Sequence, residues 1–314
     1  MIEGHDLELF ERSLRAATDQ HTGDELDAAV AELGWIDALG FDTRAAVSTL
    51  FGLLGESGAR SSALDRVVAF GLGGALDGST GVVLPAVGGW GSPARIDGGR
   101  ALVHGLATAS RPSYLVVARD GDGCGATLVD ASALECREIH GVDPALGLVE
   151  LRGEVPVEGS ERVDWPAAVD LARLALAHQL VGASRRALAL AREHALERIQ
   201  FGRPIAQFQA VRHKLAETLL AIEAAEATLD AAWIDRSAFT ATMAKATAGR
   251  SARTVARHCQ QVLAGIGFTT EHDLHRSVRR ILVLDQLFGA HAALTRHLGE
   301  QLLATRQLPP FVAL

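Results

Sequence analysis

Long helix-forming segments in the C-terminal half constrain the fold of this chain more than any other feature. Ala- and Leu-rich stretches with recurring apolar faces cover about residues 165–198, 209–234, 238–264 and 273–303. The first begins at Trp165-Pro166, and proline is well tolerated in the first turn of a helix. Apolar-faced helices longer than about 25 residues favour an antiparallel four-helix bundle.

Two regions of different character precede the bundle. Residues 1–70 are predicted to be helical, with apolar residues at helical spacing, for example Leu7, Phe10 and Leu14. Residues 71–159 contain short apolar runs such as Tyr114–Ala118, separated by polar turns, which is typical of a small β barrel or sandwich. The predicted fold is mainly α with a small β domain: a reduced N-terminal helical domain (1–70), a β domain (71–159) and a C-terminal four-helix bundle (160–314).

Composition argues against several classes of function. The formal net charge of −8 and the pI of about 5.8 do not suit a nucleic-acid-binding protein, which would carry a basic face. No apolar run reaches the roughly 18–20 residues of a membrane span, and the first residues show no signal-peptide pattern. The three cysteines lack the spacing of a metal site, so no metal is expected. We expect a soluble, cytoplasmic protein with reduced thiols.

The segment Arg198–Gln209 lies where the first long helix is predicted to end. It combines a fixed cation, an aromatic ring, a Gly-Arg-Pro turn and an amide within twelve residues. This combination suits a ligand that carries both phosphate and a ring system. Arg198 taken alone has a simpler interpretation, because a cation at the C-terminal end of a helix complements the helix dipole.

A second segment, Gln261–His275, follows the third long helix. Its Gly265-Ile-Gly267 element comes after a helix rather than a strand, which excludes a βαβ dinucleotide fold. The two segments, at their observed spacing, closely resemble two motifs of the acyl-CoA dehydrogenase family. The second also has the Glu-His-Asp-Leu-His form common in actinobacterial members. The resemblance is firm over about residues 160–290, weak over the β region and topological over the N-terminal helices.

In that family the two segments hold the ADP half of an FAD that belongs to a neighbouring subunit. The resemblance implies that Arg198 pairs with the pyrophosphate and that Gly265 permits a close backbone approach. Ala264 stands where the family has its first glycine. The cofactor-binding residues implied in this way are Arg198, Phe201, Phe208, Gln209, Gln261, Ala264 and Gly265.

The catalytic base of such an enzyme is missing from both positions where the family places it. An acyl-CoA dehydrogenase uses a glutamate to remove the α-proton of the thioester while hydride passes to the flavin. The resemblance assigns these positions to Phe288 and Ala172, and neither residue can accept a proton. No catalytic residue is therefore expected in this chain. Asp170 and Asp285 are nearby carboxylates, and each could be a base, a solvated group or part of an ion pair.

The β region also lacks the family's flavin-facing residues. The stretch Leu84–Ser92 has no Thr-Glu pair, and His104–Ser110 stands where a tryptophan-containing strand would be. Trp90 is either a relic of a flavin contact or a packing residue. Further along, the basic run of Arg276, Arg279 and Arg280 serves either ion pairs or the phosphates of CoA.

This one-sided loss resembles the degenerate short subunit of actinobacterial heterotetrameric acyl-CoA dehydrogenases, which act on steroid-CoA thioesters. The resemblance implies an α2β2 complex that acts on an acyl-CoA. FAD is shared, and a second acyl-CoA dehydrogenase-type subunit supplies the flavin contacts and the catalytic glutamate. An electron-transfer flavoprotein is a further implied partner. Two alternatives stay open: a self-sufficient homomer with Asp170 or Asp285 as base, and a structural subunit that binds no FAD.

Overall fold

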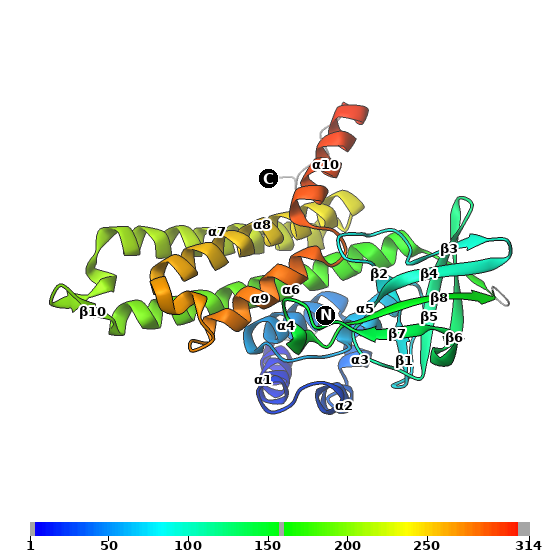
Figure 1. Ribbon diagram of the computed structural model, residues 1–314, viewed down its shortest axis with the longest axis horizontal. Coiled ribbons are helices and arrows are strands. Elements are labelled where there is room, and N and C mark those ends of the chain that lie inside the picture. The colour runs from blue at the N-terminus through cyan, green and yellow to red at the C-terminus, as the bar shows by residue number, and fades with distance from the viewer. Residues whose placement is uncertain (1–3, 157–159, 307–314) are drawn as a thin grey trace.

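The computed structural model describes residues 4–156 and 160–306 (Figure 1). Within these residues the N-terminal region is entirely helical, as the sequence predicts. Its helices are α1 (Gly4–Gln20), α2 (Asp24–Glu32), α3 (Trp35–Phe41), α4 (Thr43–Ser57) and α5 (Ala63–Gly71).

The middle region forms one sheet, with the described strands in the order β7-β8-β4-β3-β5-β6-β9. β1 pairs parallel with β5, and β2 pairs antiparallel with β4. Two short 3-10 turns connect strands of this sheet: η1 (Ala131–Ala133) lies between β6 and β7, and η2 (Pro144–Leu146) lies between β7 and β8. The strands are β1 (Thr80–Val82), β2 (Leu84–Pro85), β3 (Ala94–Asp97), β4 (Arg100–Ala107), β5 (Ser113–Asp120), β6 (Gly123–Asp130), β7 (Glu135–Glu138), β8 (Val149–Pro156) and β9 (Glu161–Val163).

The C-terminal half is helical, and local signals set where its helices begin. Asp164 caps the first helix by accepting the N–H of Ala167 at 3.0 Å, and Ser237 caps the third in the same way from Thr240 at 3.2 Å. The elements are α6 (Trp165–Glu197), β10 (Ile199–Gln200), β11 (Arg203–Pro204), η3 (Ile205–Gln207), α7 (Gln209–Asp235), α8 (Ala238–Leu263), η4 (Ala264–Phe268), α9 (Leu274–Gln286) and α10 (His291–Thr305).

The prediction of one helix over 273–303 is wrong, because that stretch forms two helices, α9 and α10. Between them the backbone becomes left-handed at Phe288 (φ 55°) and Gly289 (φ 104°). Buried Lys245 of α8 donates hydrogen bonds to the carbonyls of Asp285 at 3.0 Å and Gly289 at 3.3 Å. These bonds satisfy carbonyls that the end of α9 leaves free. The bundle therefore consists of α6 to α9, and α10 projects from it (Figure 1).

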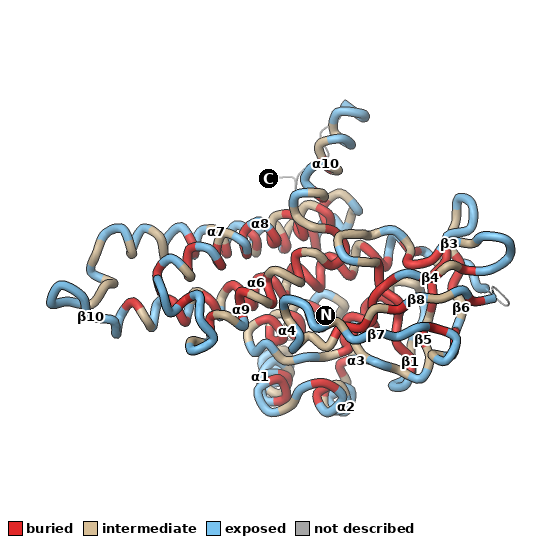
Figure 2. Tube along the Cα trace, in the orientation of Figure 1, coloured by how far each residue is buried: buried red, intermediate tan, exposed pale blue. Residues whose placement is uncertain are grey.

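The N-terminal helices and the bundle share one core. A Cβ on Gly55 of α4 would lie 2.2 Å from the carbonyl oxygen of Gln179, and one on Gly182 of α6 would lie 2.1 Å from that of Gly52. Only glycine permits the two helices to approach so closely. Buried residues line the facing sides of the bundle helices (Figure 2), and one cluster continues from α1 to Phe288. The division into three domains near residues 70 and 160 remains a prediction.

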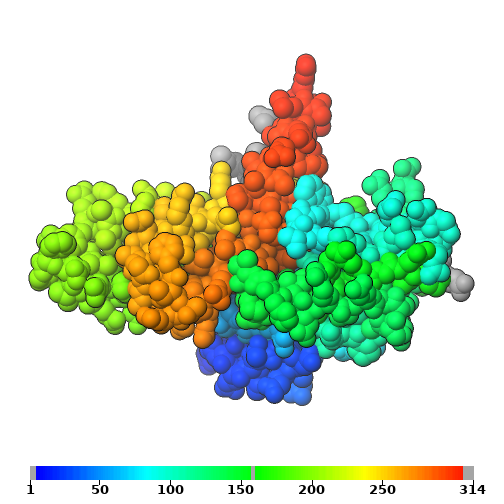
Figure 3. Space-filling view, viewed as in Figure 1, coloured from blue at the N-terminus to red at the C-terminus, as the bar shows by residue number. Residues whose placement is uncertain are grey.

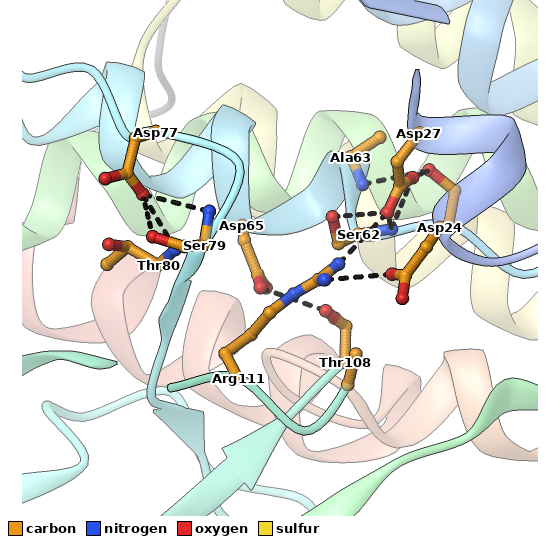
Figure 4. A network of polar contacts seen from close by, with 12 residues as sticks. Asp24, Asp27, Ser62, Ala63, Asp65, Asp77, Ser79, Thr80, Thr108 and Arg111 are labelled. Atoms are coloured by element: carbon orange, nitrogen blue, oxygen red, sulfur yellow. Dashed lines mark hydrogen bonds and ion pairs between the residues drawn. The ribbon is translucent and has the colours of Figure 1, made fainter. Parts of the chain in front are cut away.

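A polar network joins the N-terminal helices to the sheet (Figure 4). Arg111, before β5, pairs with Asp24 at 2.9 Å and with Asp27 at 3.3 Å. Thr108, at the end of β4, donates a hydrogen bond to the buried carboxylate of Asp65 at 3.0 Å. Among the described helices, none is both long enough and apolar enough to cross a membrane.

Candidate cofactor site and the position of the missing base

The connection between α6 and α7 is a short hairpin at one end of the bundle. β10 pairs with β11 across a turn made by Phe201 (φ 53°) and Gly202 (φ 75°). Positive φ at both central residues is typical of the tight turns that join antiparallel strands. An L-residue is strained in this conformation, and the Phe201 side chain is nevertheless 92% exposed. The chain thus holds an aromatic ring at a solvent-facing tip.

The predicted site residues of the first segment surround this tip. Arg198 and Gln209 are exposed, and Phe208 is half-buried. The rings of Phe201 and Phe208 meet edge to face with centroids 6.0 Å apart. The guanidinium carbon of Arg203 lies 4.5 Å from the centroid of the Phe208 ring. Sequence reasoning did not select Arg203, although it lies inside the motif, because only the folded hairpin brings it over the ring.

The second segment lies at the same end of the bundle, which forms the tip coloured green to orange in Figure 3. The rings of His194, in α6, and His272, before α9, stand edge to face with centroids 6.0 Å apart. Burial, followed by the positive neighbours His272 and Arg198, lowers the pKa of His194. No atom lies within 4 Å of where a Cβ on Gly265 would be. The predicted site residues of this segment are all exposed: Gln261, Ala264 and Gly265.

The two positions at which the sequence resemblance predicts a base are closed to solvent. Ala172 is 0% exposed and Phe288 is 1% exposed. The Phe288 ring lies 6.2 Å from that of Trp165, and its carbonyl accepts a hydrogen bond from Arg173 Nε at 3.3 Å. Packing and backbone contacts therefore occupy the region where a catalytic carboxylate would need access to a substrate.

Trp90 belongs to this same packed region. Its carbonyl accepts a hydrogen bond from Trp165 Nε1 at 3.2 Å, and Arg173 lies 5.7 Å from its ring centroid. Nearby, the Gly88 N–H donates to the carbonyl of Gln286 at the end of α9, at 3.1 Å. Trp90 is thus a packing residue here, and its loop is fastened to the bundle.

The two alternative bases are both engaged by neighbours. Asp285 is buried, and its carboxylate accepts hydrogen bonds from the His291 N–H at 3.0 Å and from Nδ1 of the same residue at 2.9 Å. Asp170 lies 3.6 Å from Arg173. Burial raises the pKa of Asp170, and the charge of Arg173 opposes this shift. Both carboxylates have partners that explain their presence without a catalytic role.

A layer of N-terminal helices, a sheet and a bundle ending in an exposed arginine-bearing hairpin define an acyl-CoA dehydrogenase fold. The structure of a steroid ACAD Tcur3481-Tcur3483 variant matches with a TM-score of 0.79 at 23% identity, over 96% of this chain and 99% of that one. The ChsE4-ChsE5 complex from Mycobacterium tuberculosis matches with a TM-score of 0.77 at 22% identity, over 99% of each chain. At such identities these likenesses establish the fold.

Sequence relatives point the same way. Residues 166–303 match the family "Acyl-CoA dehydrogenase, C-terminal domain". Acyl-CoA dehydrogenase IpdE2 of Mycobacterium tuberculosis is 33% identical over 160 residues, which are 51% of this chain and 49% of IpdE2. Acyl-CoA dehydrogenase FadE34 of the same organism is 36% identical over 163 residues, 46% of this chain and 23% of FadE34. The matches thus span about half of IpdE2 and less of FadE34. The helical bundle of this chain thus matches the C-terminal domain of the acyl-CoA dehydrogenase family.

Proposed function

We propose that this chain is one subunit of a heteromeric FAD-dependent acyl-CoA dehydrogenase. It holds the ADP half of an FAD, while a partner subunit supplies the flavin-ring contacts and the catalytic glutamate. One contrast carries the proposal: the positions of the base are buried and apolar, whereas the residues suited to a nucleotide are exposed. This contrast is what we expect of a chain that holds one end of a cofactor whose reactive ring lies in another subunit.

The exposed residues fit the ADP half of FAD by their chemistry. The Arg198 guanidinium matches a diphosphate, and the rings of Phe201 and Phe208 offer apolar and edge contacts to the cofactor. Gln209 and Gln261 supply amides, and Gly265 leaves the backbone open. The bound FAD would accept the hydride that leaves the acyl chain. Around Phe288, the side chains that the structure describes are packed together and offer no comparable opening for the flavin ring.

The same end of the bundle suits a protein partner. Large apolar side chains stand exposed around the proposed FAD residues, among them Ile199 (53%) and Phe268 (72%). Exposed apolar groups gathered in one place favour an interface over free solvent. One fold relative is a complex, ChsE4-ChsE5, and another is a steroid ACAD. We therefore favour an α2β2 assembly acting on an acyl-CoA, with a steroid-CoA as the leading substrate class, in the cytoplasm. An electron-transfer flavoprotein is the proposed electron acceptor.

Co-purification tests the proposal. The chain is expressed alone and together with an acyl-CoA dehydrogenase-type protein encoded beside it, and flavin is measured by absorbance. We expect little FAD in the single chain and stoichiometric FAD, reducible by an acyl-CoA, in the complex. If the chain alone binds FAD fully and reduces it with an acyl-CoA, the proposal is wrong. Loss of that turnover in Asp170→Asn or Asp285→Asn would then identify a self-sufficient homomer.

A single substitution separates the proposed role from a purely structural one. Arg198→Ala removes a charge-assisted contact to the diphosphate and is expected to weaken FAD retention by the complex about tenfold or more. The matched control is Arg253→Ala on α8, which removes an exposed arginine elsewhere on the bundle. Unchanged FAD content in Arg198→Ala would favour the structural subunit that binds no FAD.

A further inference from the structure

A cavity of about 410 Å³ lies between the C-terminal end of α4, the η2 turn, α6 and the first turns of α9. This volume falls within the range of small-molecule sites. Its lining contains an unusual concentration of guanidinium groups, contributed by Arg186, Arg276, Arg279 and Arg280. The basic run on α9 is expected to serve either ion pairs or the phosphates of CoA. The contacts of each arginine show which of these two roles suits it.

Arg280 serves the fold. Its side chain is buried, and Nε lies 2.6 Å from Oδ2 of Asp143, which is buried as well. Its other nitrogens donate to the carbonyls of Gly58 at 2.9 Å and Ala59 at 3.3 Å, at the end of α4. Arg280 thereby ties α9 to α4 and to the loop before η2, and each of its three guanidinium nitrogens is engaged within the fold.

The remaining carboxylates of the cavity are also accounted for. Glu56 is bound by Arg15 at 2.8 Å, and Asp273 lies 3.6 Å from Arg276. Arg186 and Arg279 make no ion pair or hydrogen bond with any residue that the structure describes. Two fixed positive charges without counter-ions therefore face one cavity.

A hydroxyl in the same wall also lacks a partner. Ser277 is 8% exposed and lines the cavity, and its side chain makes no hydrogen bond within residues 4–156 and 160–306. It lies in the first turn of α9, a helix of 13 residues whose N-terminal end carries the positive pole of its dipole. The unpartnered hydroxyl and the unpaired cations are independent observations, and both call for a ligand with anionic oxygens.

We propose that this cavity binds a phosphate ester, with Arg186 and Arg279 as its cations and Ser277 as a hydroxyl donor. The forked guanidinium matches phosphate oxygens better than any other side chain, and a helix N-terminus adds to the attraction. This site does not depend on the proposed FAD role. Its ligand chemistry has two sources in an acyl-CoA pathway, the 3′-phosphate of CoA and the diphosphate of a nucleotide.

Isothermal titration calorimetry of the full chain at low ionic strength tests the site with CoA, dephospho-CoA and inorganic phosphate. We expect saturable binding that weakens about tenfold or more in Arg186→Ala and in Arg279→Ala, as charge-assisted hydrogen bonds are lost. Ser277→Ala, which preserves the fold of α9, is expected to weaken binding about threefold or more. Arg253→Ala removes the same charge outside the cavity and is expected to leave affinity unchanged.

The probes distinguish the two sources of phosphate. Tighter binding of CoA than of dephospho-CoA assigns the site to the 3′-phosphate, and equal binding assigns it to the diphosphate. Absence of saturable binding with all three probes would overturn the proposal, and so would an equal loss in Arg253→Ala. Binding that is lost in Arg198→Ala but kept in Arg279→Ala would instead assign the ligand to the end of the bundle.

Discussion

Asp65 is a buried carboxylate at the contact between the N-terminal helices and the sheet, and its effect on stability can be measured through its titration. The side chain is 1% exposed, Oδ2 accepts the hydrogen bond from Thr108, and Oδ1 has no partner among the described residues (Figure 4). Burial raises the pKa of Asp65 from 3.8 to about 7, while the Thr108 hydrogen bond and the charge of Arg111 oppose the shift. The carboxylate is therefore costly to ionise in the folded protein.

The raised pKa makes stability depend on pH in a definite direction. The folded state binds this proton more tightly than the unfolded state, so its contribution falls as the pH rises from about 4 to 7. With a pKa of 3.8 unfolded and about 7 folded, the loss is about 2 kcal/mol at pH 5 and about 4 kcal/mol at pH 8.5. Between these two pH values, the ionisation of Asp65 therefore costs about 2–3 kcal/mol of stability.

Asp65→Asn removes this titration while keeping the shape of the side chain. Urea unfolding followed by circular dichroism at both pH values gives the stability difference between variant and wild type. We expect that difference to move by about 2–3 kcal/mol in favour of the variant from pH 5 to pH 8.5. Asp77→Asn is the control, because hydrogen bonds from Ser79 and Thr80 lower the pKa of this exposed carboxyl, which therefore does not titrate above pH 5. A constant difference for Asp65→Asn would refute the reasoning.

Three further substitutions test other features of the fold. Burial lowers the pKa of Lys245 from 10.5 to about 7, so the charged form is penalised at low pH, and the penalty fades as pH rises towards 10.5. In urea unfolding, the free energy of unfolding of the wild type should rise by about 2 kcal/mol relative to that of Lys245→Met between pH 7 and pH 9. A difference that stays constant over this range would contradict the prediction. Ala264 has φ 54° and ψ −132°, a glycine conformation, so Ala264→Gly should add about 1 kcal/mol of stability. The control is Ala216→Gly on the exposed face of α7, which should lower the stability by about 1 kcal/mol. If Ala264→Gly also lowers the stability, the backbone at Ala264 is not strained. Arg280→Ala should cost about 3–5 kcal/mol because it strands a buried carboxylate. The control is Arg276→Ala, whose stability should stay within about 0.5 kcal/mol of the wild type. Similar losses of stability in Arg280→Ala and Arg276→Ala would argue against a stabilising buried pair.

Much of the bundle could be predicted because its determinants are local. The predicted helices 165–198, 209–234 and 238–264 agree with α6, α7 and α8 to within one residue at each end. The caps at Asp164 and Ser237 lie next to the helices they start, so the signal is contained in a few adjacent residues. The two cofactor motifs were readable for the same reason, since each is a continuous segment.

The break between α9 and α10 could not be predicted, because its cause lies about 40 residues away. The periodic apolar pattern continues across Phe288, and Gly289 alone is a weak signal. The amino group of Lys245, held in the core by α8, donates hydrogen bonds to the carbonyls of Asp285 and Gly289, on either side of the break, and so stabilises it. The backbone at this break is stabilised by a contact between two helices, and the apolar periodicity of a single helix does not reveal such a contact.

By itself, the sequence determined the helical bundle, the resemblance of two segments to acyl-CoA dehydrogenase motifs and the absence of a carboxylate at positions 172 and 288. Those conclusions need only the identity and order of residues. Tertiary structure decided what surrounds Phe288: Trp90, from the loop after β2, and Trp165 and Arg173, both from α6, pack there together. It also divided the arginines of α9, pairing Arg280 with Asp143 and leaving Arg279 at a cavity without a partner among residues 4–156 and 160–306. These outcomes depend on contacts between residues that are far apart in the sequence, because such contacts decide which side chains are buried and which charges are paired.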